Sequence, residues 1–134
     1  MAIKDTAKFY EENRYCVIKE FIPPILADYL YGYAMMRANR AKTMVNSKWS
    51  GYREDIDGTY TDQQVPNTYS CYGDPAMETL LQYGLQGMRD ITGLNLKPTY
   101  SYWRLYKTGD DLKRHKDRPS CEVSTTLCLG YDNT

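Results

Sequence analysis

The sequence predicts an α+β fold, with helices in the first two thirds of the chain and strands after them. Three observations predict this class. Apolar residues recur at helical spacing after Pro23-Pro24 and again after Asp74-Pro75. Residues towards the C-terminal end alternate instead with the two-residue period of a strand. A chain of 134 residues has the length of a single domain, so we expect one domain over residues 1–134.

The N-terminal half begins with an apolar segment, YCVIKEFI at 15–22. Its β-branched and aromatic residues predict a strand that ends at the two prolines. The next segment, ILADYLYGYAMMRANRA, predicts a helix whose apolar face includes Ile25, Tyr29 and Met36. Residues 43–73 are mostly polar and turn-forming, which predicts a long loop with short strands inside it.

The segment DPAMETLLQYGLQGMRDITG carries the strongest helix signal. Asp74 is a favourable N-cap, Pro75 suits the first helical position, and Gly93 predicts the C-terminal end. The apolar residues fall on one face and predict a helix that packs against the core: Met77, Leu80, Leu81, Leu85, Met88 and Ile91.

The last third of the chain predicts three strands. PTYSYWRLY at 98–106 has two different faces, one with Tyr100, Tyr102, Arg104 and Tyr106 and the other with Ser101, Trp103 and Leu105. After a turn in KTGDD, the segments LKRHKDR and CEVSTTLCLGYD predict the second and third strands.

Composition excludes several classes of protein. The 17 basic and 17 acidic residues cancel, which argues against a nucleic acid partner. The charged N-terminus, MAIKDTAKFYEENRY, is unlike a signal peptide, and no apolar run approaches the roughly 20 residues that span a bilayer. We therefore expect a cytoplasmic protein without membrane association. The 14 tyrosines suit either a half-wet pocket or interface, or simply the strands of a β-rich protein.

RHKDR contains the only histidine of the chain, His115, two residues before Asp117. On a strand these side chains share a face and can converge on one ion. With a second histidine they would form the 2-His-1-carboxylate triad that binds Fe(II). Spacing alone is weak support. The surrounding lysines and arginines favour either a small dianionic ligand or a solvated strand edge.

The longer segment YSYWRLYKTGDDLKRHKDRPSCEVSTTLCLGYD resembles the N-terminal half of the jelly-roll core of Fe(II)/2-oxoglutarate dioxygenases, in particular the prolyl 4-hydroxylase-like group. CVIKEFIPPILADYL is similar to the opening strand and helix of that family. The resemblance implies an incomplete double-stranded β-helix (jelly roll) with N-terminal support helices. Residues 1–97 would then be the support region and residues 98–134 the core strands.

The resemblance also implies a metal and a cosubstrate site. His115 and Asp117 correspond to the first two iron ligands, and the expected cofactors are Fe(II), 2-oxoglutarate as cosubstrate, and ascorbate. Tyr106 and Thr125 correspond to residues that contact the cosubstrate, with Thr126 in place of Thr125 if the register shifts by one. Tyr102 shares the face of Tyr106, so we expect it to line the same cosubstrate pocket. Arg104 and Arg118 are expected to contact substrate, although Arg104 equally suits the cosubstrate or an acidic partner in the chain.

The family pattern further requires a second histidine followed by an arginine or lysine, and the chain has no second histidine. We therefore expect a truncated oxygenase that is inactive alone and covers its incomplete roll by homodimerisation or strand exchange. Its substrate would be a small molecule or a peptide, such as a prolyl side chain, with residues 43–73 as a covering loop. The alternative is a non-catalytic jelly-roll module that binds a partner through its tyrosine-rich face.

Overall fold

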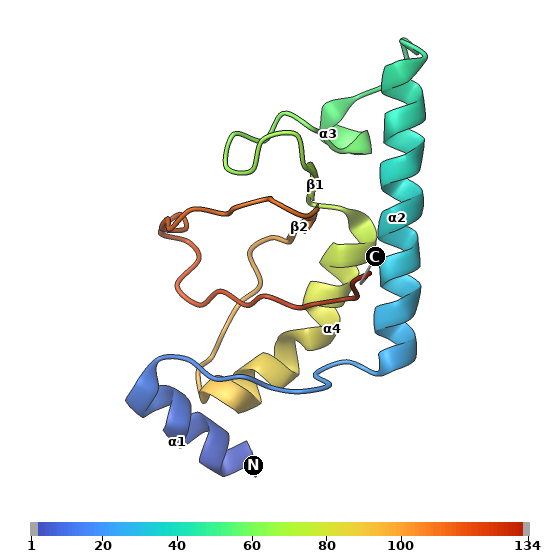
Figure 1. The fold of residues 1–134 in the computed structure, drawn as a ribbon. Coiled ribbons are helices and arrows are strands. Elements are labelled where there is room, and N and C mark those ends of the chain that lie inside the picture. Colours follow the sequence, from blue (N-terminus) through green and yellow to red (C-terminus); the bar gives the residue numbers. More distant parts are fainter. Residues whose placement is uncertain (1–2, 133–134) are drawn as a thin grey trace.

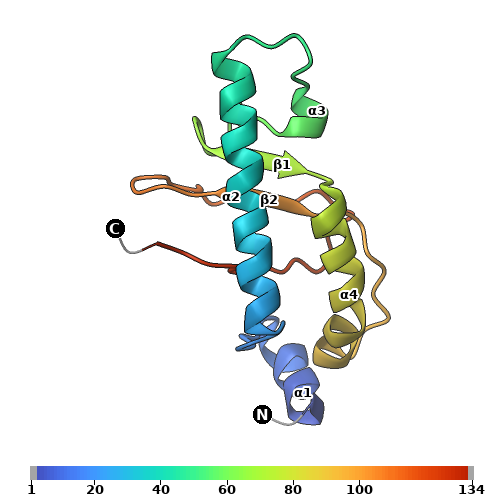
Figure 2. The same cartoon turned by 90° about the vertical axis from the view of Figure 1, so that its right-hand side faces the viewer.

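The computed structural model describes residues 3–132 and has an α+β architecture (Figure 1). The elements follow one another as α1 (Ile3–Asn13), α2 (Pro24–Asn46), α3 (Glu54–Asp57), β1 (Tyr69–Tyr72), α4 (Pro75–Thr92) and β2 (Tyr102–Leu105). Helix α2 crosses one face of the two strands, and α4 lies beside it (Figure 2). The predicted α+β class is therefore confirmed, while α1 was not anticipated.

Strands β1 and β2 pair antiparallel, with Ser70 opposite Arg104 and Cys71 opposite Trp103. One face of the sheet packs against α2 through Tyr69, Trp103 and Leu105, which belong to the hydrophobic core. The opposite face carries Ser70, Tyr72, Tyr102 and Arg104, because side chains alternate along each strand. The two faces predicted for this strand are confirmed, although β2 is shorter than the expected 98–106.

Helix α2 buries a different face from the predicted one. Ile25, Tyr29 and Met36 are 80%, 73% and 73% exposed. The buried residues are mostly small: Leu30, Ala34, Ala38, Ala41 and Met44. Small side chains let the helix approach the aromatic residues of the sheet closely. The predicted helix is therefore confirmed, but the bulky residues at helical spacing do not lie on its packing face.

Helix α4 forms as predicted. The side chain of Asp74 accepts hydrogen bonds from the backbone N–H groups of Ala76 and Met77, and Gly93 ends the helix in the left-handed conformation. Phe21 lies so close to Gly84 and Gly87 that a Cβ at either position would come within 3.0 Å of its ring. These glycines therefore let the 15–22 segment pack on α4.

Three of the predicted strands do not form. Residues 15–22, LKRHKDR and CEVSTTLCLGYD have irregular backbone over the described residues, so the expected 98–134 strand region contains β2 alone. A strand requires a hydrogen-bonded neighbour, and these segments pair with none. Their apolar residues are nevertheless used, since Leu127 and Leu129 pack against the core.

The 43–73 segment contains more regular secondary structure than the predicted loop. It contains the end of α2, α3 and β1, and the expected short strand is therefore confirmed. An isolated bridge also joins Thr59 to Ser70. Among the helices of residues 3–132, none combines the length and apolar character needed to cross a membrane.

A buried polar cluster joins α2, α4 and the 54–57 turn of helix. The side chain of Asp74 is 0% exposed and accepts hydrogen bonds from the Tyr33 hydroxyl at 2.9 and 2.8 Å. Arg37 Nε lies 3.4 Å from the same carboxylate, and its Nη2 donates to the carbonyl of Ile56 at 2.5 Å. Burial and the hydrogen bond to Asp74 raise the pKa of Tyr33 to about 12. The Asp74 carboxylate thus caps one helix and fastens it to another.

We predict that Asp74→Ala lowers the free energy of unfolding by about 3–5 kcal/mol, because it removes the cap and leaves Arg37 as an uncompensated, mostly buried charge. Asp74→Asn keeps a capping side chain but also removes the charge beside Arg37, so its loss should be smaller than that of Asp74→Ala by the contribution of the cap, about 1 kcal/mol. Urea denaturation measures both values. The control Asp90→Ala, an exposed acid on the same helix, should change stability by no more than about 0.5 kcal/mol. If Asp74→Ala lowers the free energy of unfolding no more than Asp90→Ala does, the role of Asp74 as cap and as partner of Arg37 is contradicted.

Candidate functional site

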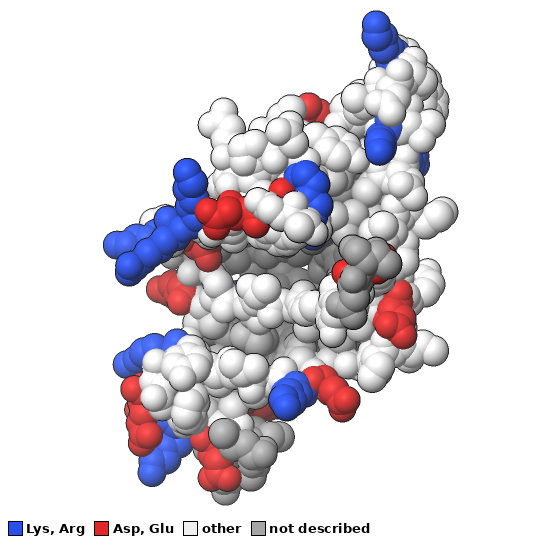
Figure 3. All heavy atoms as spheres, in the orientation of Figure 1, with Lys and Arg blue, Asp and Glu red and all other residues white. Residues whose placement is uncertain are grey.

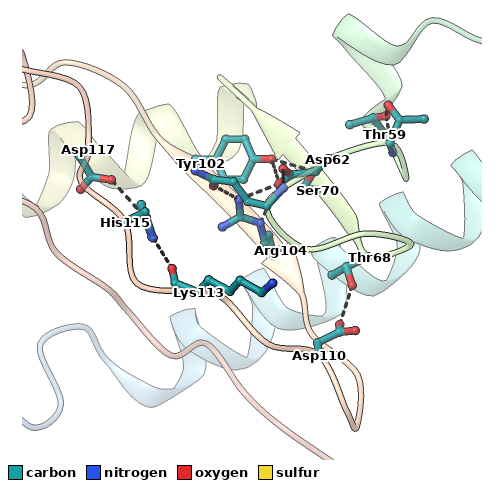
Figure 4. A network of polar contacts seen from close by, with 12 residues as sticks. Thr59, Asp62, Thr68, Ser70, Tyr102, Arg104, Asp110, Lys113, His115 and Asp117 are labelled. Atoms are coloured by element: carbon teal, nitrogen blue, oxygen red, sulfur yellow. Dashed lines mark hydrogen bonds and ion pairs between the residues drawn. The ribbon is translucent and has the colours of Figure 1, made fainter.

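The polar face of the sheet is covered by the segment that precedes β1 (Figure 4). Arg104 donates from Nε and Nη2 to one oxygen of Asp62, at 2.9 and 2.6 Å, and from Nη2 to Gln64 Oε1 at 2.5 Å. Tyr102 donates to the same oxygen of Asp62 at 2.5 Å, and its ring lies 4.5 Å below the guanidinium. Of the roles left open for Arg104, pairing with an acid of the chain is the one observed.

This ion pair is nearly closed to solvent, with side-chain exposures of 10% for Arg104 and 11% for Asp62. Burial alone would raise the pKa of Asp62, but the hydrogen bonds from Tyr102, the Gln64 N–H and Arg104 hold that pKa below its usual value. Burial raises the pKa of Tyr102, and the hydrogen bond to Asp62 raises it further. Asp62 is therefore a carboxylate and Tyr102 a neutral phenol at neutral pH.

The turn after β2 is held by a second acid. Asp110 accepts hydrogen bonds from the ammonium and the backbone N–H of Lys107 at 2.6 and 2.9 Å, and from the Thr68 hydroxyl at 2.5 Å. These bonds, from Lys107 first, lower the pKa of Asp110 to about 2. The turn leads directly into RHKDR, so it fixes where that segment leaves the sheet.

His115 and Asp117 lie together although the segment is not a strand. His115 Nε2 is 3.5 Å from Asp117 Oδ1, and the two side chains are 36% and 41% exposed. His115 Nδ1 is 2.8 Å from the carbonyl oxygen of Lys113. A carbonyl only accepts, so Nδ1 carries a proton, and Nε2 is the ring nitrogen that faces Asp117. Ser124 Oγ donates to the other carboxylate oxygen at 2.6 Å.

Arg118 ties this segment to the sheet. Its guanidinium lies 4.5 Å from the ring centroid of Tyr100 and 5.8 Å from that of Tyr72, and the two rings are 5.1 Å apart. Tyr72 belongs to the polar face of the sheet and the ring of Tyr100 packs on it, so the cation–π contact places the His115–Asp117 segment beside that face. Figure 4 draws no contact between His115–Asp117 and the Asp62–Arg104 group, which are therefore two neighbouring but separate clusters.

The remaining residues expected at the site lie in two different parts of the structure. Tyr106 is exposed but interacts with Arg104. Thr125 and Thr126 instead line a cavity of about 360 Å³ between the end of α1 and the end of α4. Ser124, not Thr125, contacts the His–Asp pair. The expected strand register would have placed Thr125 at the cosubstrate, and without strand pairing that register does not hold.

Sequence reasoning missed Asp62, Ser70 and Ser124. Asp62 lies 42 residues before Arg104 in a turn-rich segment, and no periodicity links them. Ser70 is buried at 0% exposure within 2.9 Å of Tyr102 Oη, and its position in a short strand gave no signal. The adjacent Ser124 and Thr125 could have been considered together, because the two differ only in register.

The donor atoms of His115 and Asp117 fit a first-row metal ion. Imidazole nitrogen and carboxylate oxygen both suit iron, and each side chain has an outer hydrogen bond that orients it. Within residues 3–132, no third His, Cys, Asp or Glu joins the pair to complete a metal-binding group. Lys and Arg side chains project with nearby acids at the left edge of Figure 3, so the segment around the pair is of mixed charge.

Comparison of the chain with protein-family models, curated proteins and solved structures gives no match. The resemblance to the dioxygenases therefore stays a prediction from the sequence pattern of residues 99–132.

We predict that the single histidine is in the Nδ1–H tautomer, the minor form of free imidazole, because Lys113 accepts from Nδ1. Nitrogen NMR of the imidazole at about pH 8, where histidine is normally neutral, reads the tautomer without assignment, since the chain has one histidine. Asp117→Asn should leave this tautomer unchanged, because the Lys113 carbonyl remains. An Nε2–H tautomer would contradict the geometry.

Proposed function

We propose that the chain is part of an Fe(II)- and 2-oxoglutarate-dependent oxygenase of the prolyl 4-hydroxylase-like group, with an incomplete jelly roll. The observation that carries this proposal is the arrangement of His115 and Asp117. Two potential ligand atoms face each other at 3.5 Å, and separate hydrogen bonds, to the Lys113 carbonyl and from Ser124, orient the two side chains. Metal-binding histidines and carboxylates commonly have such outer partners.

His115 Nε2 and Asp117 Oδ1 would hold the iron. Bound Fe(II), with 2-oxoglutarate and oxygen, supplies the oxidation of a substrate C–H bond. A third protein ligand would have to come from outside the described residues or from a second chain. A second chain is also the means by which homodimerisation or strand exchange would cover the incomplete roll.

The polar face of the sheet would supply the ligand contacts. Tyr102 and Arg104 lie on the polar face of the sheet, where both are bonded to Asp62, and Tyr106 interacts with Arg104. Arg118 places the His115–Asp117 segment beside this face. Phenol and guanidinium donors suit the carboxylates of 2-oxoglutarate. Arg118 stacks on Tyr100 and is exposed, so its N–H groups would meet a small-molecule or peptide substrate at the edge of this face. Thr125 would join the cosubstrate site only after a rearrangement of residues 121–132.

A non-catalytic binding module is the second candidate. The specific observation in its favour is the stack of Tyr72, Tyr100 and Arg118, because Tyr72 is exposed and aromatic–arginine surfaces are frequent at binding interfaces. This module would bind its partner without a requirement for metal.

We predict weak binding of Mn(II), a redox-stable substitute for Fe(II), measured as loss of the free Mn(II) signal in electron paramagnetic resonance. His115→Ala and Asp117→Ala should abolish this binding, since each removes one of two protein ligands. Ser124→Ala should weaken it by about tenfold or more, because the carboxylate loses its orienting partner. Asp111→Ala removes an exposed acid of the same segment and should leave it unchanged.

With two protein ligands, succinate release dependent on Fe(II) and 2-oxoglutarate should stay at background for the isolated chain and for His115→Ala. Equal Mn(II) binding by the wild type and His115→Ala would overturn the metal assignment and favour the binding module. Succinate release that persists in His115→Ala would overturn the role of His115.

A further inference from the structure

Arg104 and Tyr102 are arranged as in a carboxylate-binding site, and the carboxylate that they bind is the side chain of Asp62 from the same chain. Three donors converge on the single oxygen Asp62 Oδ2: Arg104 Nε at 2.9 Å, Arg104 Nη2 at 2.6 Å and Tyr102 Oη at 2.5 Å. The second acceptor on Arg104 Nη2 is the amide oxygen of Gln64, at 2.5 Å. The guanidinium and the phenol come from β2 and are rigidly placed, whereas both acceptors come from the covering segment.

The covering segment is held at its two ends and is free of apolar burial between them. At one end Tyr60 packs on Tyr69 with ring centroids 5.3 Å apart, and at the other end Val65 is 1% exposed. Between them Thr61, Gln63 and Gln64 are exposed. Displacing residues 61–64 would therefore withdraw no apolar side chain of this segment from the core. The main free-energy cost of this displacement is the loss of the hydrogen bonds from Arg104 and Tyr102 to the segment.

A free carboxylate can replace those bonds. Its two oxygens match the paired N–H groups of a guanidinium, and one of them can also accept from the Tyr102 hydroxyl. Arg104 is always charged and is nearly buried, so it requires an anionic partner whether or not Asp62 occupies the site. The site therefore favours a carboxylate over a neutral ligand or water.

We propose that Arg104 and Tyr102 form a carboxylate-binding site in which Asp62 is an exchangeable internal occupant, and that binding of a small carboxylate releases residues 61–64 from the sheet. The ligand class is a small mono- or dicarboxylate. The segment then acts as a latch: it is closed when Asp62 is bound and open when the ligand replaces it. This inference deepens the oxygenase proposal, which assigns the same two side chains to the carboxylates of 2-oxoglutarate. It does not require a metal, so its test and the Mn(II) test can fail independently.

The test is rescue of Asp62→Ala by acetate, formate or succinate, measured as the thermal unfolding midpoint against sodium chloride of equal ionic strength. We expect the variant to unfold at a lower temperature than the wild type and each carboxylate to raise its midpoint saturably. Carboxylate should bind the variant about tenfold or more tightly than the wild type, where tethered Asp62 competes at high effective concentration.

Two control variants make the test specific. Asp110→Ala also removes an aspartate that is paired with a cation, Lys107, but its partner is open to solvent. Carboxylates should raise its midpoint no more than they raise that of the wild type. The double variant Asp62→Ala/Arg104→Gln should lose the rescue, because the guanidinium is gone.

Two further measurements keep the proposal falsifiable if Asp62→Ala does not fold. Asp62→Asn keeps an acceptor for Arg104 but no charge, and acetate should raise its midpoint as well. In the wild type, succinate should accelerate hydrogen exchange of the Gln64 backbone N–H, which is bonded to Asp62 Oδ1 at 2.9 Å. Absence of rescue in the folded Asp62 variants, rescue that survives Arg104→Gln, or wild-type Gln64 exchange unaffected by succinate would each overturn the proposal.

Discussion

The interaction on which the rest of the structure depends is the buried carboxylate of Asp74. It caps α4 and receives both the Tyr33 hydroxyl and the Arg37 guanidinium of α2, so it fixes the angle and distance between the two long helices. Arg37 extends the same cluster to α3 through the carbonyl of Ile56. With only two short strands, the sheet has too few hydrogen bonds to organise the domain alone. The helices therefore act as the platform against which β1 and β2 present their polar face.

The two long helices position the site residues indirectly, through the strands that pack against α2. Trp103 and Leu105 are fixed against α2, and alternation along the strand then directs Tyr102 and Arg104 to the opposite side. Arg118 continues the arrangement by stacking on Tyr100, which brings the His115–Asp117 segment to the same side. Neither contact involves a regular strand beyond residue 105. His115 and Asp117 are consequently positioned by side-chain contacts and a turn rather than by hydrogen bonds between strands.

Local signals predicted local structure well. The Asp-Pro start and glycine end of α4 depend on neighbouring residues only, and the alternation in β2 correctly separated its polar and apolar faces. The predicted strands at 15–22, 112–118 and 121–132 were wrong because β propensity describes a side chain, whereas a strand needs a partner. The contact of Asp62 with Arg104, across 42 residues, had no sequence signal. His115 and Asp117 were singled out correctly as neighbours, but through a turn and Ser124 rather than through strand geometry.

The proposed metal role of His115 can be measured directly, because the chain has one histidine. Pulsed electron paramagnetic resonance of the Mn(II)-loaded protein detects an imidazole nitrogen coordinated to the metal. The account predicts coupling to one imidazole nitrogen, which is lost in His115→Ala. A bound Mn(II) ion without nitrogen coupling, or the same coupling in His115→Ala, would contradict it.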